Sequence, residues 1–159
     1  MPLSPLMQGK LKRALNARRI AIVGASKEQL SVGMGPIYNL LSAQFDGEII
    51  PVNPKYDEIS GYKCYPDLES IDPPPDVAAL LLNQHAAVEM AERAGQLGIS
   101  AVVIVTGGFK EVRSGGEELN RRLEETALRY EMPIIGPNTL GFSSFHQRLH
   151  SIFWSIWEF

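Results

Sequence analysis

A loop rich in small residues follows a short apolar run near the start of the chain. The run, residues 20–23, has the length of a buried strand, and a helix is predicted to begin close to Pro36. Between a strand and a helix, such a loop directs free main-chain N–H groups toward a phosphate. We predict a phosphate-binding turn, with a plain tight turn as the alternative because the pattern is not G-x-G-x-x-G. The candidate binding residues are Gly24, Ala25, Ser26, Val32 and Gly33.

A second candidate loop follows the mainly apolar residues 48–52 and reads Asn53-Pro54-Lys55. In an NAD-binding fold the corresponding strand usually ends in an acid that binds the ribose hydroxyls. This chain carries Lys55 instead, and a compact positive charge suits a phosphate on the ribose. The alternative is a solvated turn lysine without a ligand.

Two further loops of small and polar residues follow apolar runs in the second half of the chain. One run, residues 101–105, leads into the loop 106–111, and another, residues 133–135, leads into the loop 136–141. The carboxyl ends of strands in open α/β sheets are where ligands bind. We therefore predict a polar, small-walled site built largely of main chain. These loops add the candidate residues Thr106, Gly107, Gly108 and Asn138.

The elements that must position these loops alternate between strand and helix. A run without polar alternation at 77–82 is typical of a strand covered on both faces. Helices are predicted over 36–45, over 84–97 and after an N-cap at Ser114, with one more helix within residues 1–18 lying across an end of the sheet. Short crossovers of this kind require a parallel sheet with helices on both faces. We predict a Rossmann-like, doubly wound α/β fold with a mainly parallel sheet.

The bulk composition narrows the classes of function. A chain of 159 residues suggests one domain, and a net charge of −3 gives no support to a nucleic-acid partner or a membrane surface. No apolar run approaches membrane-spanning length, and Cys64 is the only cysteine, so a cytoplasmic location is expected. We predict no metal site. The histidines, expected in packing or at the surface rather than in catalysis, are His85, His146 and His150.

With the loops placed, the chain resembles the coenzyme A-binding domain that begins the NDP-forming acyl-CoA synthetases. This group includes ADP-forming acetate–CoA ligase and, more distantly, the alpha subunit of succinyl-CoA synthetase. The segments that carry the resemblance follow the family's order and span nearly the whole chain. They are R-I-A-I-V-G-A-S at 19–26, G-E-I-I-P-V-N-P-K-Y at 47–56, G-Y-K-C-Y-P at 61–66, G-G-F-K-E at 107–111 and I-G-P-N-T-L-G at 135–141.

The resemblance implies coenzyme A as the ligand and a role for each loop. The loop 26–33 would receive the phosphates of the coenzyme, and Lys55 would meet the phosphorylated ribose. Residues 106–108 would line the path of the pantetheine arm, and Asn138 would lie near the point where the thiol reaches the active site. Two positions depart from the family's usual pattern. Leu82-Asn83-Gln84 replaces a Val-Pro-Ala end of the middle strand, and Thr139 replaces a cysteine.

Residues 1–141 are predicted to form the coenzyme A-binding domain, and residues 142–159 an aromatic-rich C-terminal extension. The extension is expected either to dock other domains or subunits of a synthetase or to fold back on the sheet. The full enzymes of the family also carry a phosphohistidine domain and a nucleotide-grasp domain, which match no segment here. We therefore expect coenzyme A binding without ligation by this chain alone, and we assign no catalytic residue.

Two alternatives stay open at this point. One is an NAD(P)-binding redox-sensing or oxidoreductase domain, although the missing G-x-G-x-x-G and the missing acid after residue 52 argue against NAD. The other is an interaction module with a vestigial nucleotide site.

Overall fold

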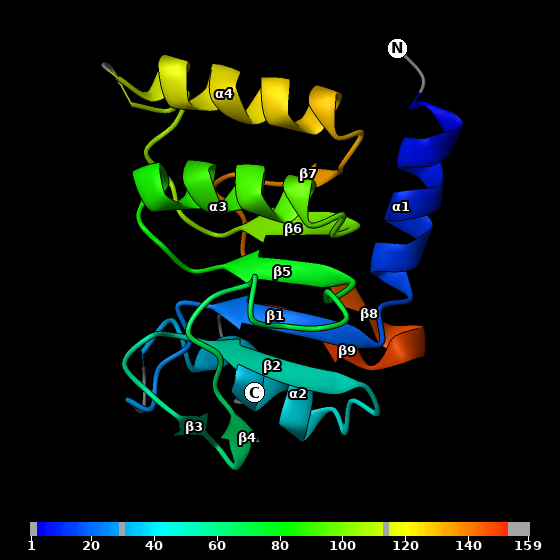
Figure 1. Ribbon diagram of the computed structural model, residues 1–159, viewed down its shortest axis with the longest axis vertical. Helices are drawn as coiled ribbons and strands as arrows, with labels where there is room; N and C mark the ends of the chain where they lie inside the picture. The colour runs from blue at the N-terminus through cyan, green and yellow to red at the C-terminus, as the bar shows by residue number, and fades with distance from the viewer. Residues whose placement is uncertain (1–2, 29–30, 113–114, 153–159) are drawn as a thin grey trace.

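A central parallel sheet organises the computed structural model, which describes residues 3–28, 31–112 and 115–152. The sheet order is β2-β1-β5-β6-β7, and each neighbouring pair of strands is parallel. In Figure 1 the arrows of β1, β2, β5 and β6 point the same way, so these strands end at one edge of the sheet. The strands are β1 (Arg19–Val23), β2 (Glu48–Val52), β5 (Val77–Leu80), β6 (Ala101–Ile104) and β7 (Ile134–Ile135).

Helices cover both faces of this sheet (Figure 1). Side chains of α3 and α4 pack in one hydrophobic cluster with one face, and side chains of α2 pack in a second cluster with the other face. α1 runs across the end of the sheet where the strands begin. The predicted Rossmann-like, doubly wound α/β fold is thereby confirmed. The helices are α1 (Pro5–Leu15), α2 (Gly35–Ser42), α3 (Gln84–Gln96) and α4 (Gly116–Arg129).

Several elements end earlier than the apolar pattern predicts. The strands predicted over 77–82 and 101–105 stop at Leu80 and Ile104, because the last apolar residues of each run already belong to the loops at the carboxyl edge. α2 ends at Ser42 rather than at residue 45, since Gln44 adopts a left-handed conformation with φ +54°. α4 begins after an N-cap at Gly115, whereas the predicted cap, Ser114, lies outside the described residues.

The edge strand β2 contains a proline and leads into a small hairpin. Pro51 is tolerated because β2 is the edge of the sheet, where proline cannot interrupt a ladder on both sides. The predicted extended segment 61–66 forms part of an antiparallel hairpin of β3 (Glu58–Ile59) and β4 (Tyr62–Lys63). Beyond β4, Tyr65 bridges back to Val52 at the end of β2.

The first part of the aromatic-rich extension folds back on the α2 face. It forms an antiparallel hairpin of β8 (Ser143–Ser144) and β9 (Leu149–His150), with the 3-10 turn η1 (Phe145–Gln147) between them. Leu149 is fully buried in the cluster under α2, and the side chain of Asn39 donates a hydrogen bond to the carbonyl of Ile152 at 2.7 Å. Residues 153–159 lie outside the described residues, and the domain division at residue 141 stays a prediction.

Candidate functional site

The predicted binding loops lie next to one another at the carboxyl edge of the sheet. The strand order places them in the sequence β2 loop, β1 loop, β5 loop, β6 loop and β7 loop along this edge, on the left in Figure 1. The connection from β1 leads to one side of the sheet, and the connection from β5 leads to the other. β1 and β5 therefore flank the topological switch point, where open α/β sheets bind ligands.

Hydrogen bonds join the loops after β1 and β2. The side-chain amide of Asn53 donates to the carbonyl of Ala25 at 2.8 Å, and its oxygen accepts from the main-chain N–H of Lys55 at 2.9 Å. The N–H of Gly24 donates to the carbonyl of Val52 at 3.0 Å. Asn53, a predicted binding residue, thus uses its carboxamide to hold the two loops together.

Two predicted glycines of the β1 loop are required by contacts within the chain. Gly24 has φ +88°, and a Cβ atom there would lie 2.4 Å from the carbonyl oxygen of Leu81. A Cβ atom at Gly33 would lie 2.4 Å from the carbonyl oxygen of Gly24 and 3.0 Å from the N atom of Ser26. Close packing of the main chain therefore excludes a side chain at both positions.

Part of the β1 loop and the tip of β2 are open to solvent, whereas Ala25 is fully buried. Val32 is 52% exposed, and the hydroxyl of Ser26 accepts a hydrogen bond from the N–H of Glu28 at 3.0 Å. Pro54 and Lys55 are exposed. Residues 29 and 30 of the predicted phosphate-binding loop lie outside the described residues.

The loops after β5, β6 and β7 are joined through Thr106. Its hydroxyl donates to the carbonyl of Leu82, and its carbonyl accepts from the N–H of Asn138 at 3.0 Å. Asn138 has φ +56°, and its side-chain oxygen would lie 3.4 Å from a Cβ atom at Gly107. The rim is therefore continuous from the β5 loop to the β7 loop.

Glu111 supports the predicted pantetheine loop, and the sequence analysis assigned it no role. Its carboxylate accepts a hydrogen bond from the N–H of Gly108 at 2.6 Å. The main-chain N–H groups of Glu111 itself and Gly108 lower the pKa of this carboxyl group; desolvation opposes them, and the N–H of Phe109 adds to the lowering. The available signal was its place in the quoted segment G-G-F-K-E, three residues after Gly108.

Two lysines give the β2 side of the rim a positive charge. Among the described residues, neither Lys55 nor Lys27 has a carboxylate within ion-pair distance. The ammonium group of Lys27 lies 5.5 Å from the centre of the Tyr56 ring, a cation–π distance. Lys27 was not predicted as a binding residue, although it directly follows Ser26. This side of the rim is suited to an anion.

A groove of about 420 Å³ lies elsewhere, between α1, α4 and the edge strand β7. Its walls are mostly apolar, and it shares only the start of the β7 loop, Gly136 and Pro137, with the rim. Its volume therefore does not locate the predicted site, which is an open edge of loops rather than an enclosed cavity. Within the described ranges, no helix is long and apolar enough to cross a membrane, and no group of three or more His, Cys, Asp or Glu side chains could hold a metal ion.

Comparison with known proteins agrees with the resemblance. Residues 18–144 match the family described as CoA binding domain. The ADP-forming acetate–CoA ligase of Methanocaldococcus jannaschii is 39% identical over 144 residues, which cover 91% of this chain and 20% of that enzyme. The alpha subunit of ADP-forming acetate–CoA ligase II of Pyrococcus furiosus is 33% identical over 141 residues, covering 89% of this chain and 31% of that subunit.

A solved structure shows the same similarity. The dinucleotide-forming acetyl-coenzyme A synthetase 1 of Ca. Korarchaeum cryptofilum, in complex with phosphate and ADP, superposes with a TM-score of 0.84 and 38% identity over 90% of this chain and 30% of that chain. The chain thus spans about a fifth to a third of the length of these relatives. The matches give no support to an NAD(P)-dependent oxidoreductase or to a vestigial interaction module. The chain belongs to the family of CoA-binding domains.

Proposed function

We propose that this chain binds coenzyme A along the carboxyl edge of its sheet, as a module of an NDP-forming acyl-CoA synthetase of the acetate–CoA ligase type. The observation that carries the proposal is the continuous rim of loops, with lysines that form no ion pair with a described residue toward one end and glycine-lined main chain toward the other. Neighbouring strands lie about 4.8 Å apart, so five strands offer an edge of roughly 19 Å, which suits a long, extended ligand.

The strand order gives each part of the ligand a place on this rim. Lys55, after β2, binds the phosphate on the ribose, and the β1 loop from Gly24 to Gly33 binds the diphosphate through main-chain N–H groups. The pantetheine arm then runs over the β5 loop toward residues 106–108, and the thiol ends near Asn138. Charge supports this direction, because the phosphates of the ligand are anionic and the two lysines lie at the β2 side of the rim.

The reaction of the whole enzyme needs parts beyond this chain. The relatives are three to five times as long as the segment that they share with it. In our proposal other domains or subunits make the acyl phosphate and deliver it to the bound thiol, and the C-terminal aromatic segment 142–159 contacts them. The chain alone binds coenzyme A without ligation.

Isothermal titration with coenzyme A and with dephospho-coenzyme A tests the proposal. We expect coenzyme A to bind about 3- to 10-fold more tightly, the size of one charge-assisted contact at an exposed lysine. Lys55→Met should remove this preference. Lys12→Met removes an exposed lysine from α1, at the other end of the sheet, and should keep the preference.

The outcomes test coenzyme A binding and the role of Lys55 separately. If the unmodified chain binds neither compound, the proposed function is wrong. If it binds both with equal affinity, coenzyme A remains the ligand, but Lys55 does not read its ribose phosphate.

A further inference from the structure

Gln84 carries a carboxamide at the carboxyl edge of the sheet. It is the first residue of α3, directly after Asn83, whose side chain caps the helix by accepting from the N–H of Ala86 at 3.1 Å. Gln84 is half-buried, and its side chain makes no hydrogen bond with any residue in the described ranges. A partly buried carboxamide normally has partners, so this one is available to a ligand.

The carboxamide of Gln84 faces the loop after the neighbouring strand. A Cβ atom at Gly108 would lie 3.2 Å from the carboxamide carbon of Gln84 and 3.4 Å from both its nitrogen and its oxygen. Gly108 has φ +99°, a conformation that also favours glycine. The Gln84 side chain therefore bridges the space between the β5 and β6 loops.

The sheet order makes this space a necessary crossing for an extended ligand. β5 lies between β1 and β6, so a molecule that runs from the β1 loop to the β6 loop must pass over the end of β5. In coenzyme A placed with its phosphates on the β1 and β2 loops, the part that crosses is the pantetheine arm. This arm contains secondary amides, and a primary carboxamide can both donate to and accept from an amide.

We infer that the carboxamide of Gln84 hydrogen bonds an amide of the pantetheine arm, which makes Gln84 a specificity-determining residue for the arm rather than for the nucleotide. The inference rests on the proposed function, because it needs coenzyme A on this rim. The arm passes over Gln84 and the main chain of residues 106–108, and the adenosine phosphates do not reach this residue.

The test compares two ligands on the variant Gln84→Met, which keeps a long side chain against Gly108 but removes both polar atoms. Coenzyme A carries the arm, and adenosine 3′,5′-bisphosphate lacks it. By isothermal titration, Gln84→Met should bind coenzyme A about 3- to 10-fold more weakly, the size of one hydrogen bond, and the bisphosphate unchanged. His85→Ala, at the next residue, replaces an exposed side chain and should leave both affinities as they are.

Each outcome decides the inference. A selective loss for coenzyme A supports it. Equal weakening of both ligands, or no weakening of either, overturns it while leaving coenzyme A binding in place. If the unmodified chain binds neither ligand, the proposed function fails, and the role of Gln84 fails with it.

Discussion

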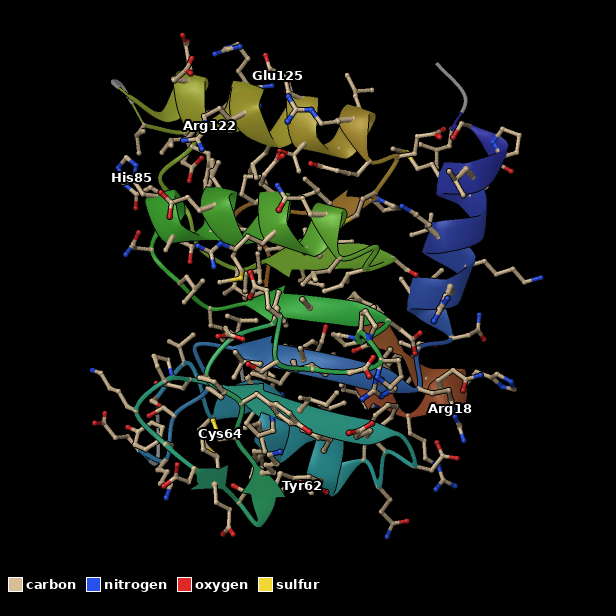
Figure 2. All side chains as sticks on the ribbon, viewed as in Figure 1. Arg18, Tyr62, Cys64, His85, Arg122 and Glu125 are labelled. Atoms are coloured by element: carbon tan, nitrogen blue, oxygen red, sulfur yellow. The ribbon has the colours of Figure 1, made fainter. Side chains whose placement is uncertain are left out.

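The two ends of the central sheet satisfy their polar groups in opposite ways. Where the strands begin, the carboxylate of Asp76 accepts from the N–H groups of Arg18 and Arg19 at 2.9 and 3.0 Å and from the guanidinium of Arg13 at 2.7 Å. Where they end, Lys55 and Gln84 have no such partners among the described residues. In Figure 2, Arg18 lies at the first end and His85, next to Gln84, at the second.

This difference indicates that the amino end of the sheet serves folding stability and the carboxyl end serves binding. At the amino end, α1 and the start of β1 supply internal partners for a buried charge, so the end is closed and contributes to folding. At the carboxyl end, the side chains that do form hydrogen bonds, such as Asn53 and Thr106, join loops to one another. The polar groups there that lack a partner in the described part of the chain, those of Lys55 and Gln84, are the ones that a ligand can use.

Removing Asp76 should have the largest effect on folding and little effect on the ligand. Asp76→Ala leaves the main-chain N–H groups of Arg18 and Arg19 and the Arg13 guanidinium without their acceptor. We expect a loss of about 2–4 kcal/mol in the free energy of unfolding, measured by urea denaturation. Coenzyme A affinity, measured where the variant is folded, should stay within about 2-fold, because the carboxylate is at the opposite end of the sheet from the rim. A loss of coenzyme A affinity without a loss of stability would contradict this division between the two ends of the sheet.

The same carboxylate predicts how stability depends on pH. Burial alone would raise the pKa of Asp76, but the N–H group of Arg18, the guanidinium of Arg13 and the N–H group of Arg19 together hold it below its ordinary value. Its stabilising effect is therefore complete above the unfolded pKa of about 3.9 and is lost as the pH falls through the lower folded pKa. The free energy of unfolding should fall less steeply on acidification in Asp76→Ala than in the unmodified chain.

Gly24→Ala should have the next largest effect, because it disturbs the packing under the rim. A Cβ atom there would lie 2.4 Å from the carbonyl oxygen of Leu81, and the residue has φ +88°. Gly61→Ala is a matched control, with φ +82° but no atom within 4 Å of the added Cβ. We expect a loss of about 1 kcal/mol for Gly61→Ala and at least about 2 kcal/mol for Gly24→Ala, measured by urea denaturation. Equal losses would show that the contact with Leu81 is unimportant.

The loops of the rim and the packing of Gly24 show how far the sequence predicts this site. The unbroken apolar runs identified the parallel strands, and the short crossovers required a parallel sheet with helices on both faces. The rim could thus be predicted as a set of loops. What a sequence pattern does not contain is the contact between two loops, so the packing of Gly24 against Leu81 could not be predicted from it.

The hairpin within the C-terminal extension and the hydrogen bonds that join the loops were not predicted, for a similar reason. β8 and β9 have two residues each, too few for an alternating pattern to predict a strand, and Leu149 is buried only because α2 lies against it. Asn53 and Thr106 were correctly placed on the rim, but their hydrogen bonds to neighbouring loops depend on a strand order that single residues do not reveal.

The smallest effect is expected at Glu111, which shapes the rim from outside. Its carboxylate accepts from the N–H of Gly108, so Glu111→Ala should loosen the loop 106–108 without a measurable change in the urea midpoint. We expect coenzyme A to bind about 2- to 5-fold more weakly and adenosine 3′,5′-bisphosphate equally well, because in the proposed arrangement only the arm contacts this loop. Glu89→Ala replaces another exposed glutamate, on α3, and should change neither affinity. If Glu111→Ala weakens the binding of both ligands alike, the two halves of the rim are coupled, and separate loops do not bind the arm and the nucleotide independently.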